Sequence, residues 1–307
     1  MDGLVLLNSE MTPLQYIPVA EGDFNIGDTF DFELKIPDTV EVQQNFYVAL
    51  ENSEFGGIID RVKRDTGKRY ITIGGRTWQG MLQETYNVVS YQSCDTNDLV
   101  EATAFMVEHR IPNIFKYGEK VIVPEKPITF RSRIYVLPAI REVYRRLGYR
   151  FHILFDPSIN KPIIQVVPVT RYDDPENIRD TLNYSWQISN CPNFAIGQMK
   201  GGDLYAFLDI ATGVVSRSDY RSGENIRAMI KESSGDDEEE NYQALVEALL
   251  EQYQDVKKIE LYDIDAETFH LDDQISFYAG KNKYTASITS KSAVIQDGYI
   301  KYEVKAE

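Results

Sequence analysis

The chain has 307 residues, of which 43% are hydrophobic and 26% are charged, as in a globular protein with room for two or three domains. Its formal net charge of -16 argues against a free nucleic-acid binder, because neutralising phosphates requires Lys and Arg. The 20 tyrosines and 14 phenylalanines favour strands over helices.

The N-terminal sequence MDGLVLLNSEM has no basic residue and a short apolar run, so we expect no signal peptide. No apolar stretch approaches the 18 residues of a membrane-spanning helix. We therefore expect synthesis in a reducing cytoplasm. Cys94 and Cys191 leave open one disulfide or two buried free thiols, and we expect the free thiols.

Residues 1–90 are predicted to form a small β domain. Residues 29–36, TFDFELKI, alternate apolar and polar side chains, which is typical of a half-buried strand. Residues 57–73 predict a hairpin that turns at residues 65–67, where Gly can adopt a positive φ.

The segment YITIGGRTWQGML, residues 70–82, could be read as a phosphate-binding turn. It lacks the Lys and Ser/Thr of a phosphate loop, so we expect Gly74–Gly75 to end the return strand of the hairpin instead. Trp78 and Leu82 are expected to anchor a short helix. We predict that Arg76 and Trp78 contribute to an inter-domain or inter-subunit contact.

Two helices are predicted next. Asp98 can cap the first, with Glu101 completing a capping box, and Pro112 stops it. The second runs over residues 138–147 and ends at Gly148.

Two strands follow, at 149–155 and 162–169, and they complete an inserted α/β module over residues 91–175. Arg141, Arg145 and Arg146 form a basic stripe on its second helix. This stripe is either the solvated face of the helix or a contact with an acidic partner, and we retain all three as candidate interface residues.

Residues 176–307 are predicted to be β-rich again, with strands at 185–189 and within 203–218. One helix near 238–258 interrupts them, preceded by the acidic run SSGDDEEE at 233–240. Acidic residues at a helix start suit the helix dipole, and the run lacks the ligand spacing of a calcium loop.

The two β-rich parts resemble each other weakly. IGDTFDFEL at 26–34 parallels LDDQISFYA at 271–279, and a hairpin with a Gly-containing turn follows each. Two small β-barrel-like domains of similar topology would explain the similarity. The expected fold class is thus β-rich α+β, with two such domains and an inserted α/β module.

The sequence resembles the baseplate hub, or tail-associated, proteins of tailed phages and phage-derived particles. Residues 55–82 match the family's strand, tight hairpin, return strand and G-R-x-hydrophobic segment. Residues 149–156, YRFHILFD, match its middle module, and residues 269–304 match its closing β unit. Asp272 stands where the family often has Gly.

This resemblance implies a structural, non-enzymatic protein of a virion tail or tail-like particle, made in the bacterial cytoplasm. Three copies would form a homotrimeric ring in which six barrels mimic sixfold symmetry. The ring would join the tail tube protein to a spike or tip protein, and DNA would pass through it without specific binding. No cofactor is implied, and contractile and flexible tails both remain open.

We expect no catalytic, cofactor-binding or metal site. No HExxH, G-x-S-x-G or nucleotide-binding motif occurs, and His152 is expected to be a core residue. The competing hypothesis is a carbohydrate-binding or glycan-hydrolysing tail protein, with Glu54 and Asp60 as its paired carboxylates.

Overall fold

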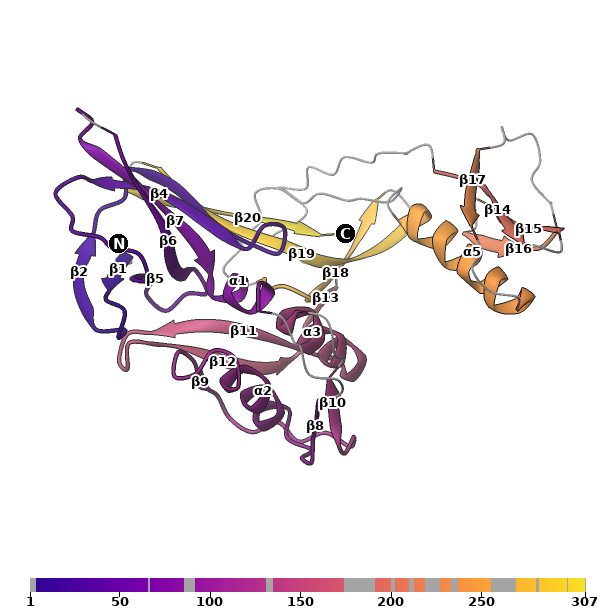
Figure 1. Ribbon diagram of the computed structural model, residues 1–307, viewed down its shortest axis with the longest axis horizontal. Helices are drawn as coiled ribbons and strands as arrows, with labels where there is room; N and C mark the ends of the chain where they lie inside the picture. The colour runs from indigo at the N-terminus through magenta and orange to yellow at the C-terminus, as the bar shows by residue number, and fades with distance from the viewer. Residues whose placement is uncertain are drawn as a thin grey trace. The chain divides into compact units, whose positions relative to one another are not determined.

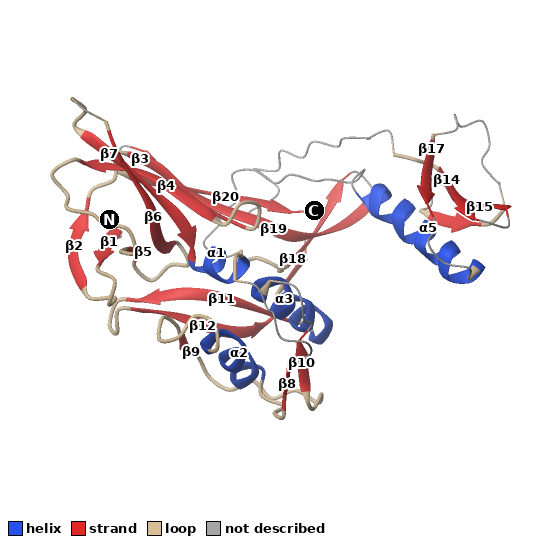
Figure 2. Cartoon of the chain, in the orientation of Figure 1, coloured by secondary structure: helices blue, strands red, loops and turns tan. Residues whose placement is uncertain are grey.

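The structure is a computed structural model of the chain, shown in Figures 1 and 2. It describes residues 4–65, 67–85, 92–130, 135–173, 191–199, 202–209, 213–218, 227–232, 237–254, 269–279, 282–296 and 298–306. The chain divides into two compact units. Unit 1 comprises Met1–Leu182 and Leu261–Ala306, and unit 2 is formed by Asn183–Glu260. Both are rich in strands, in agreement with the expected β-rich α+β class.

Unit 1 contains a sheet of 11 strands in the order β13-β18-β19-β3-β4-β7-β6-β5-β1-β2, with β20 paired to β19. The strands are β1 (Leu4–Leu7), β2 (Pro13–Ile17), β3 (Glu21–Ile26), β4 (Asp31–Pro37), β5 (Tyr47–Leu50), β6 (Gly56–Arg64), β7 (Tyr70–Thr77), β13 (Arg171–Asp173), β18 (Gln274–Ala279), β19 (Asn282–Gln296) and β20 (Tyr299–Ala306). Within the described ranges no sheet closes on itself, so the two expected barrels are not seen as closed barrels.

The C-terminal hairpin belongs to this same sheet. Residue 291 of β19 is paired with residue 26 of β3, and the ladder continues to the pair 296 and 21. We expected residues 176–307 to form a separate second domain, whereas residues 269–306 lie in unit 1. The pairing covers an edge of β3 that would otherwise be exposed, which gives a physical reason for the difference.

The predicted strand and hairpin of the first part are confirmed. In β4, Phe32, Leu34 and Ile36 are buried and the residues between them are more exposed. The hairpin of β6 and β7 turns at Gly67, which has a φ of 80°.

The prediction that Gly74–Gly75 end the return strand is wrong, since β7 continues to Thr77. Their partner strand β6 has a bulge between Ile59 and Arg61. A Cβ on Gly75 would lie 1.9 Å from the carbonyl oxygen of Ile58. Gly75 therefore allows a close approach of the two strands rather than a turn.

The middle part of unit 1 contains a three-stranded sheet, a two-stranded sheet and two helices. Its elements are β8 (Gln92–Cys94), α2 (Leu99–Glu108), β9 (Lys116–Tyr117), β10 (Ile128–Phe130), α3 (Val136–Leu147), β11 (Tyr149–Asp156) and β12 (Lys161–Pro168). Both predicted strands are confirmed in β11 and β12, which pair antiparallel along their full length.

The helices of this part differ from the prediction in detail. Asp98 caps α2 by accepting a hydrogen bond from the Val100 amide at 3.0 Å. Glu101 does not complete a capping box, because its carboxylate accepts from the Thr96 hydroxyl at 2.7 Å and the Asp98 amide also donates to Thr96. Helix α3 begins at Val136, two residues early, and its predicted end at Gly148 is confirmed by a φ of 77°.

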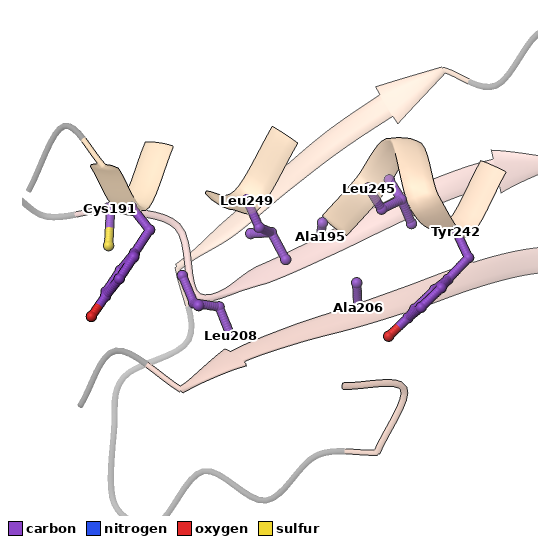
Figure 3. Packing of buried hydrophobic residues seen from close by; sticks show 8 residues of the cluster. Cys191, Ala195, Ala206, Leu208, Tyr242, Leu245 and Leu249 are labelled. Atoms are coloured by element: carbon purple, nitrogen blue, oxygen red, sulfur yellow. The ribbon is translucent and has the colours of Figure 1, made fainter. Parts of the chain in front are cut away.

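Unit 2 is a four-stranded sheet in the order β16-β15-β14-β17, packed against helix α5. Its elements are β14 (Phe194–Met199), β15 (Gly202–Asp209), β16 (Val214–Ser216), β17 (Ala228–Glu232) and α5 (Glu238–Gln254). Figure 3 shows Leu245 and Leu249 of the helix facing Ala195, Ala206 and Leu208 of the strands.

The acidic start of α5 is confirmed as a helix start, because Asp237 accepts hydrogen bonds from the amides of Glu239 and Glu240. The predicted strand at 185–189 and the predicted helix end at residues 255–258 lie outside the described residues.

Candidate functional site

Arg76 lies on β7 and is held by carboxylates of unit 1. Its Nε and Nη2 donate to the two oxygens of Asp60 at 2.8 and 2.7 Å, and Nη1 lies 3.4 Å from Glu84. Asp60 is the extra residue of the β6 bulge, which brings its carboxylate to Arg76. The fork-to-fork geometry makes this a strong pair, and only a third of the Arg76 side chain is exposed.

Trp78 is the first residue of α1 (Trp78–Gln83), the predicted short helix. Its indole is completely buried and stacks on Tyr47 of β5 and Phe155 of β11, with ring centroids 5.9 and 6.4 Å away. It therefore joins the large sheet to the middle part inside unit 1. Any effect of Trp78 on a contact between subunits must act through the fold of unit 1.

Two of the three arginines in the predicted basic stripe of α3 converge on one carboxylate. Arg141 donates to Asp272 at 3.0 and 2.7 Å, and Arg145 donates to Asp272 at 3.0 and 2.8 Å. Burial raises the pKa of the Asp272 carboxyl, but Arg141 and Arg145 outweigh burial and hold that pKa below its usual range. Arg146 forms a separate pair with Glu125 at 2.7 Å.

Asp272 stands at the position where the expected family pattern often has Gly. Its φ is 70°, a left-handed conformation that favours Gly and is tolerated by Asp. At the matching position of the first β-rich part, Gly27 has a φ of 112°. The two segments therefore share a positive φ just ahead of β4 and β18, and here the carboxylate of Asp272 additionally binds α3.

Asp273, which follows Asp272 in the sequence, is fully buried and accepts hydrogen bonds from three donors. Its Oδ1 accepts from Arg150 Nε at 2.6 Å and from the Thr170 amide at 2.8 Å, and Oδ2 accepts from the His270 amide at 3.2 Å. Arg150 is itself almost completely buried, so the charges are paired and hydrogen-bonded within the protein.

His152 is hydrogen-bonded to Arg150, the residue that also binds Asp273. Arg150 donates to His152 Nδ1 at 3.1 Å, so the proton of the neutral ring lies on Nε2, which donates to Gln165 at 3.0 Å. Burial, together with the nearby His270, lowers the pKa of His152 to about 4. The expectation that His152 is a satisfied core residue is confirmed.

Glu54 and Lys291 form another buried ion pair, near His270. Their side chains are 3% and 4% exposed and lie 2.5 Å apart, and Glu54 Oε1 is 3.6 Å from His270 Nδ1. Burial raises the pKa of Glu54, but Lys291 and His270 lower it overall. This pair links the turn after β5 to β19, which lies 237 residues away in sequence.

The carboxylates of the competing glycosidase hypothesis are thus both engaged in ion pairs, Asp60 with Arg76 and Glu54 with Lys291. Among the described residues no three His, Cys, Asp or Glu side chains gather as a metal site requires. Cys94 and Cys191 are not disulfide-bonded; Cys191 is buried, whereas Cys94 is only half-buried. Among the described residues, no helix is long and apolar enough to cross a membrane.

Sequence reasoning missed the carboxylates that the arginines bind. In the sequence, Asp272 stands out only as an unusual residue at a turn, and no pattern marks Asp273, Glu54 or Lys291 as an ion-pair partner. An adjacent pair of acidic residues ahead of a strand, combined with four arginines at 141–150, is the pattern that could have suggested them.

No protein-family model matches the chain. No curated protein matches it either. Several solved structures share its fold. A tail protein from Neisseria meningitidis MC58 is 12% identical, with a TM-score of 0.50 over 99% of this chain and 95% of that one.

A 43 kDa tail protein of prophage MuSo2 from Shewanella oneidensis is 10% identical, with a TM-score of 0.56 over 99% and 98% of the two chains. A chain of the phage P2 baseplate in its activated conformation is 10% identical, with a TM-score of 0.53 over 100% and 99%. The chain therefore has the fold of phage tail and baseplate proteins along its full described length.

Proposed function

We propose that this chain is a structural hub protein of a phage tail or tail-like particle. Three copies form a ring of pseudo-sixfold symmetry that joins the tail tube protein to a spike or tip protein. The observation that carries the proposal is the fold likeness, which spans nearly all of this chain and of the tail and baseplate chains.

The repeat within unit 1 supports the pseudo-sixfold part of the proposal. The segments 26–34 and 271–279 each have a positive φ at their second residue, Gly27 or Asp272, and lead into strands of the same sheet. In a trimer, two similar β-rich parts per copy supply six similar positions. Of the expected ranges, 1–90 and the described C-terminal residues 269–306 of 176–307 enter the proposal as these two parts, and 91–175 enters it as the module between them.

The arginine–carboxylate pairs supply the rigidity that a ring requires. They connect α3 and β11 of the middle part to the segment ahead of β18, at positions 123 to 131 residues apart in sequence. Bidentate pairs fix both distance and orientation between the elements they join. Arg145 and Arg146, whose side chains are 61% and 58% exposed, are the predicted interface residues best placed to reach a neighbouring copy.

The test is assembly. The purified chain is measured by native mass spectrometry alone and after mixing with the tube and spike proteins encoded beside it, and the complexes are imaged by electron microscopy. We expect a trimer that binds both partners and shows no glycan hydrolysis. A chain that stays monomeric in all mixtures and binds or cleaves glycans would refute the hub function and favour the competing one.

A further inference from the structure

A groove with apolar walls opens at one end of the large sheet of unit 1. Its volume is about 830 Å³, and its lining includes Tyr16 and Ile17 of β2, Ile295 of β19 and Ile300 of β20. Among the described strands β2 pairs only with β1, so it is an edge strand of the sheet. A free strand edge and an apolar groove therefore lie together.

Large exposed side chains surround this groove. Tyr16 and Tyr70 line it with 64% and 48% of their surface exposed, and Tyr299, at 81%, lies between two lining residues. Strand β2 has no charged residue, although exposed edge strands commonly carry charges that prevent association. Exposed tyrosines around an apolar groove are typical of a protein–protein contact.

A basic hairpin adjoins the groove. Tyr70 begins β7, and the preceding residues 61–69 at the tip of the β6–β7 hairpin contain five basic residues and one acidic residue. The five basic side chains are exposed. Figure 1 shows this hairpin reaching past the ends of the neighbouring strands, so its charges are accessible to a partner.

The charge of the chain identifies the partner. Outside this tip the remaining 298 residues contain 27 basic and 47 acidic residues, so the rest of each copy carries a formal charge of -20 against +4 at the tip. We infer that the basic hairpin and the apolar groove together bind an acidic surface of a second copy of this chain. The inference rests on the proposed homotrimer and names the surface through which its copies meet.

The geometry of such a contact suits a ring. A basic and apolar surface on one copy meets a different, acidic surface on the next, and heterologous contacts of this type form a ring when the rotation between copies closes. A nucleic acid could bind the basic tip, but it would not fit the apolar groove. Glu51 is the single charged residue among those that line the groove. A protein partner therefore fits both features.

The experiment compares self-association of four full-length proteins by analytical ultracentrifugation at low and high salt. The hairpin variant is Lys63→Glu/Arg69→Glu and the groove variant is Tyr70→Gln. The matched control is Lys116→Glu/Lys120→Glu, which changes the net charge equally at exposed positions of the middle part. Circular dichroism and thermal melting establish that all four are folded.

We expect the hairpin variant to associate about tenfold more weakly than wild type at low salt, with a smaller difference at high salt, because screening removes the attraction. The groove variant should be weaker at both salts and the control should match wild type. If the wild type forms a trimer and the hairpin and groove variants form trimers equally well, this inference is wrong, and the proposed homotrimer is not contradicted. A monomeric wild type overturns both.

Discussion

Arg141 and Asp272 form a bidentate ion pair across 131 residues of sequence, with donor–acceptor distances of 3.0 and 2.7 Å. The Asp272 side chain is 9% exposed and that of Arg141 15%, so the pair is largely shielded from water. Together with the hydrogen bonds from Arg145 to the same carboxylate, this contact fixes helix α3 to the segment that leads into β18.

We predict that Arg141→Ala lowers the free energy of unfolding by about 1–3 kcal/mol, because it leaves a mostly buried carboxylate with Arg145 as its remaining partner. Urea denaturation measures the change. Arg146→Ala is the matched control on the same helix, since its partner Glu125 and its own side chain are more exposed, and it should cost less than about 1 kcal/mol. Equal effects of the two substitutions would contradict the prediction.

Trp78→Ala should destabilise unit 1 by about 3–5 kcal/mol, the usual cost of removing a buried tryptophan. The indole stacks between Tyr47 and Phe155, so its loss opens a cavity between the large sheet and the middle part. Thermal unfolding followed by near-ultraviolet circular dichroism reports the change. Trp78→Phe, which keeps one aromatic ring, should lose less stability; a larger loss than in the alanine variant would show that stacking is not the cause.

Local patterns predicted local structure well. The alternation of residues 29–36 identified β4, and Gly148 identified the end of α3, because each depends on neighbours within a few residues. The pairing of β19 with β3 and of Arg141 with Asp272 could not be read in this way. Both depend on which distant segments the topology brings together, and four arginines near one another indicate a basic surface without naming its partner.

The glycine pair shows the same limit. The sequence marks Gly74–Gly75 as a special backbone position, but a turn and a close strand approach both favour Gly. The bulge in β6 decides between them, and nothing in the sequence of β7 reveals a bulge in its partner.

We predict that Gly75→Ala costs at least about 1–3 kcal/mol or prevents folding, because its Cβ would lie 1.9 Å from a backbone oxygen. Backbone atoms on both strands would have to move, and the bulge that presents Asp60 to Arg76 would be disturbed. Gly118→Ala is the control, since its nearest neighbour would be 3.4 Å away and its backbone is unstrained. The fraction of soluble protein and its urea midpoint measure both variants, and a Gly75→Ala protein as stable as the control would disprove the steric argument.

The buried His152 should make unit 1 sensitive to mild acid. Burial lowers its pKa to about 4 in the folded protein, whereas an unfolded histidine titrates near about 6.5. Between these values the unfolded chain binds a proton that the folded chain does not, so stability falls as the pH falls through this window, by up to about 1.4 kcal/mol per pH unit.

The carboxylates Glu54 and Asp272, whose pKa values are lowered by their cationic partners, add to the loss only below about pH 5, where the unfolded carboxyls begin to bind protons. The free energy of unfolding measured from pH 7 to about pH 5.5 therefore reports on His152 without a contribution from these two carboxylates. His152→Gln should flatten the slope in this range. A His152→Gln protein with the wild-type slope would show that the buried ring takes up its proton without cost, and that Arg150 and His270 do not hold it neutral.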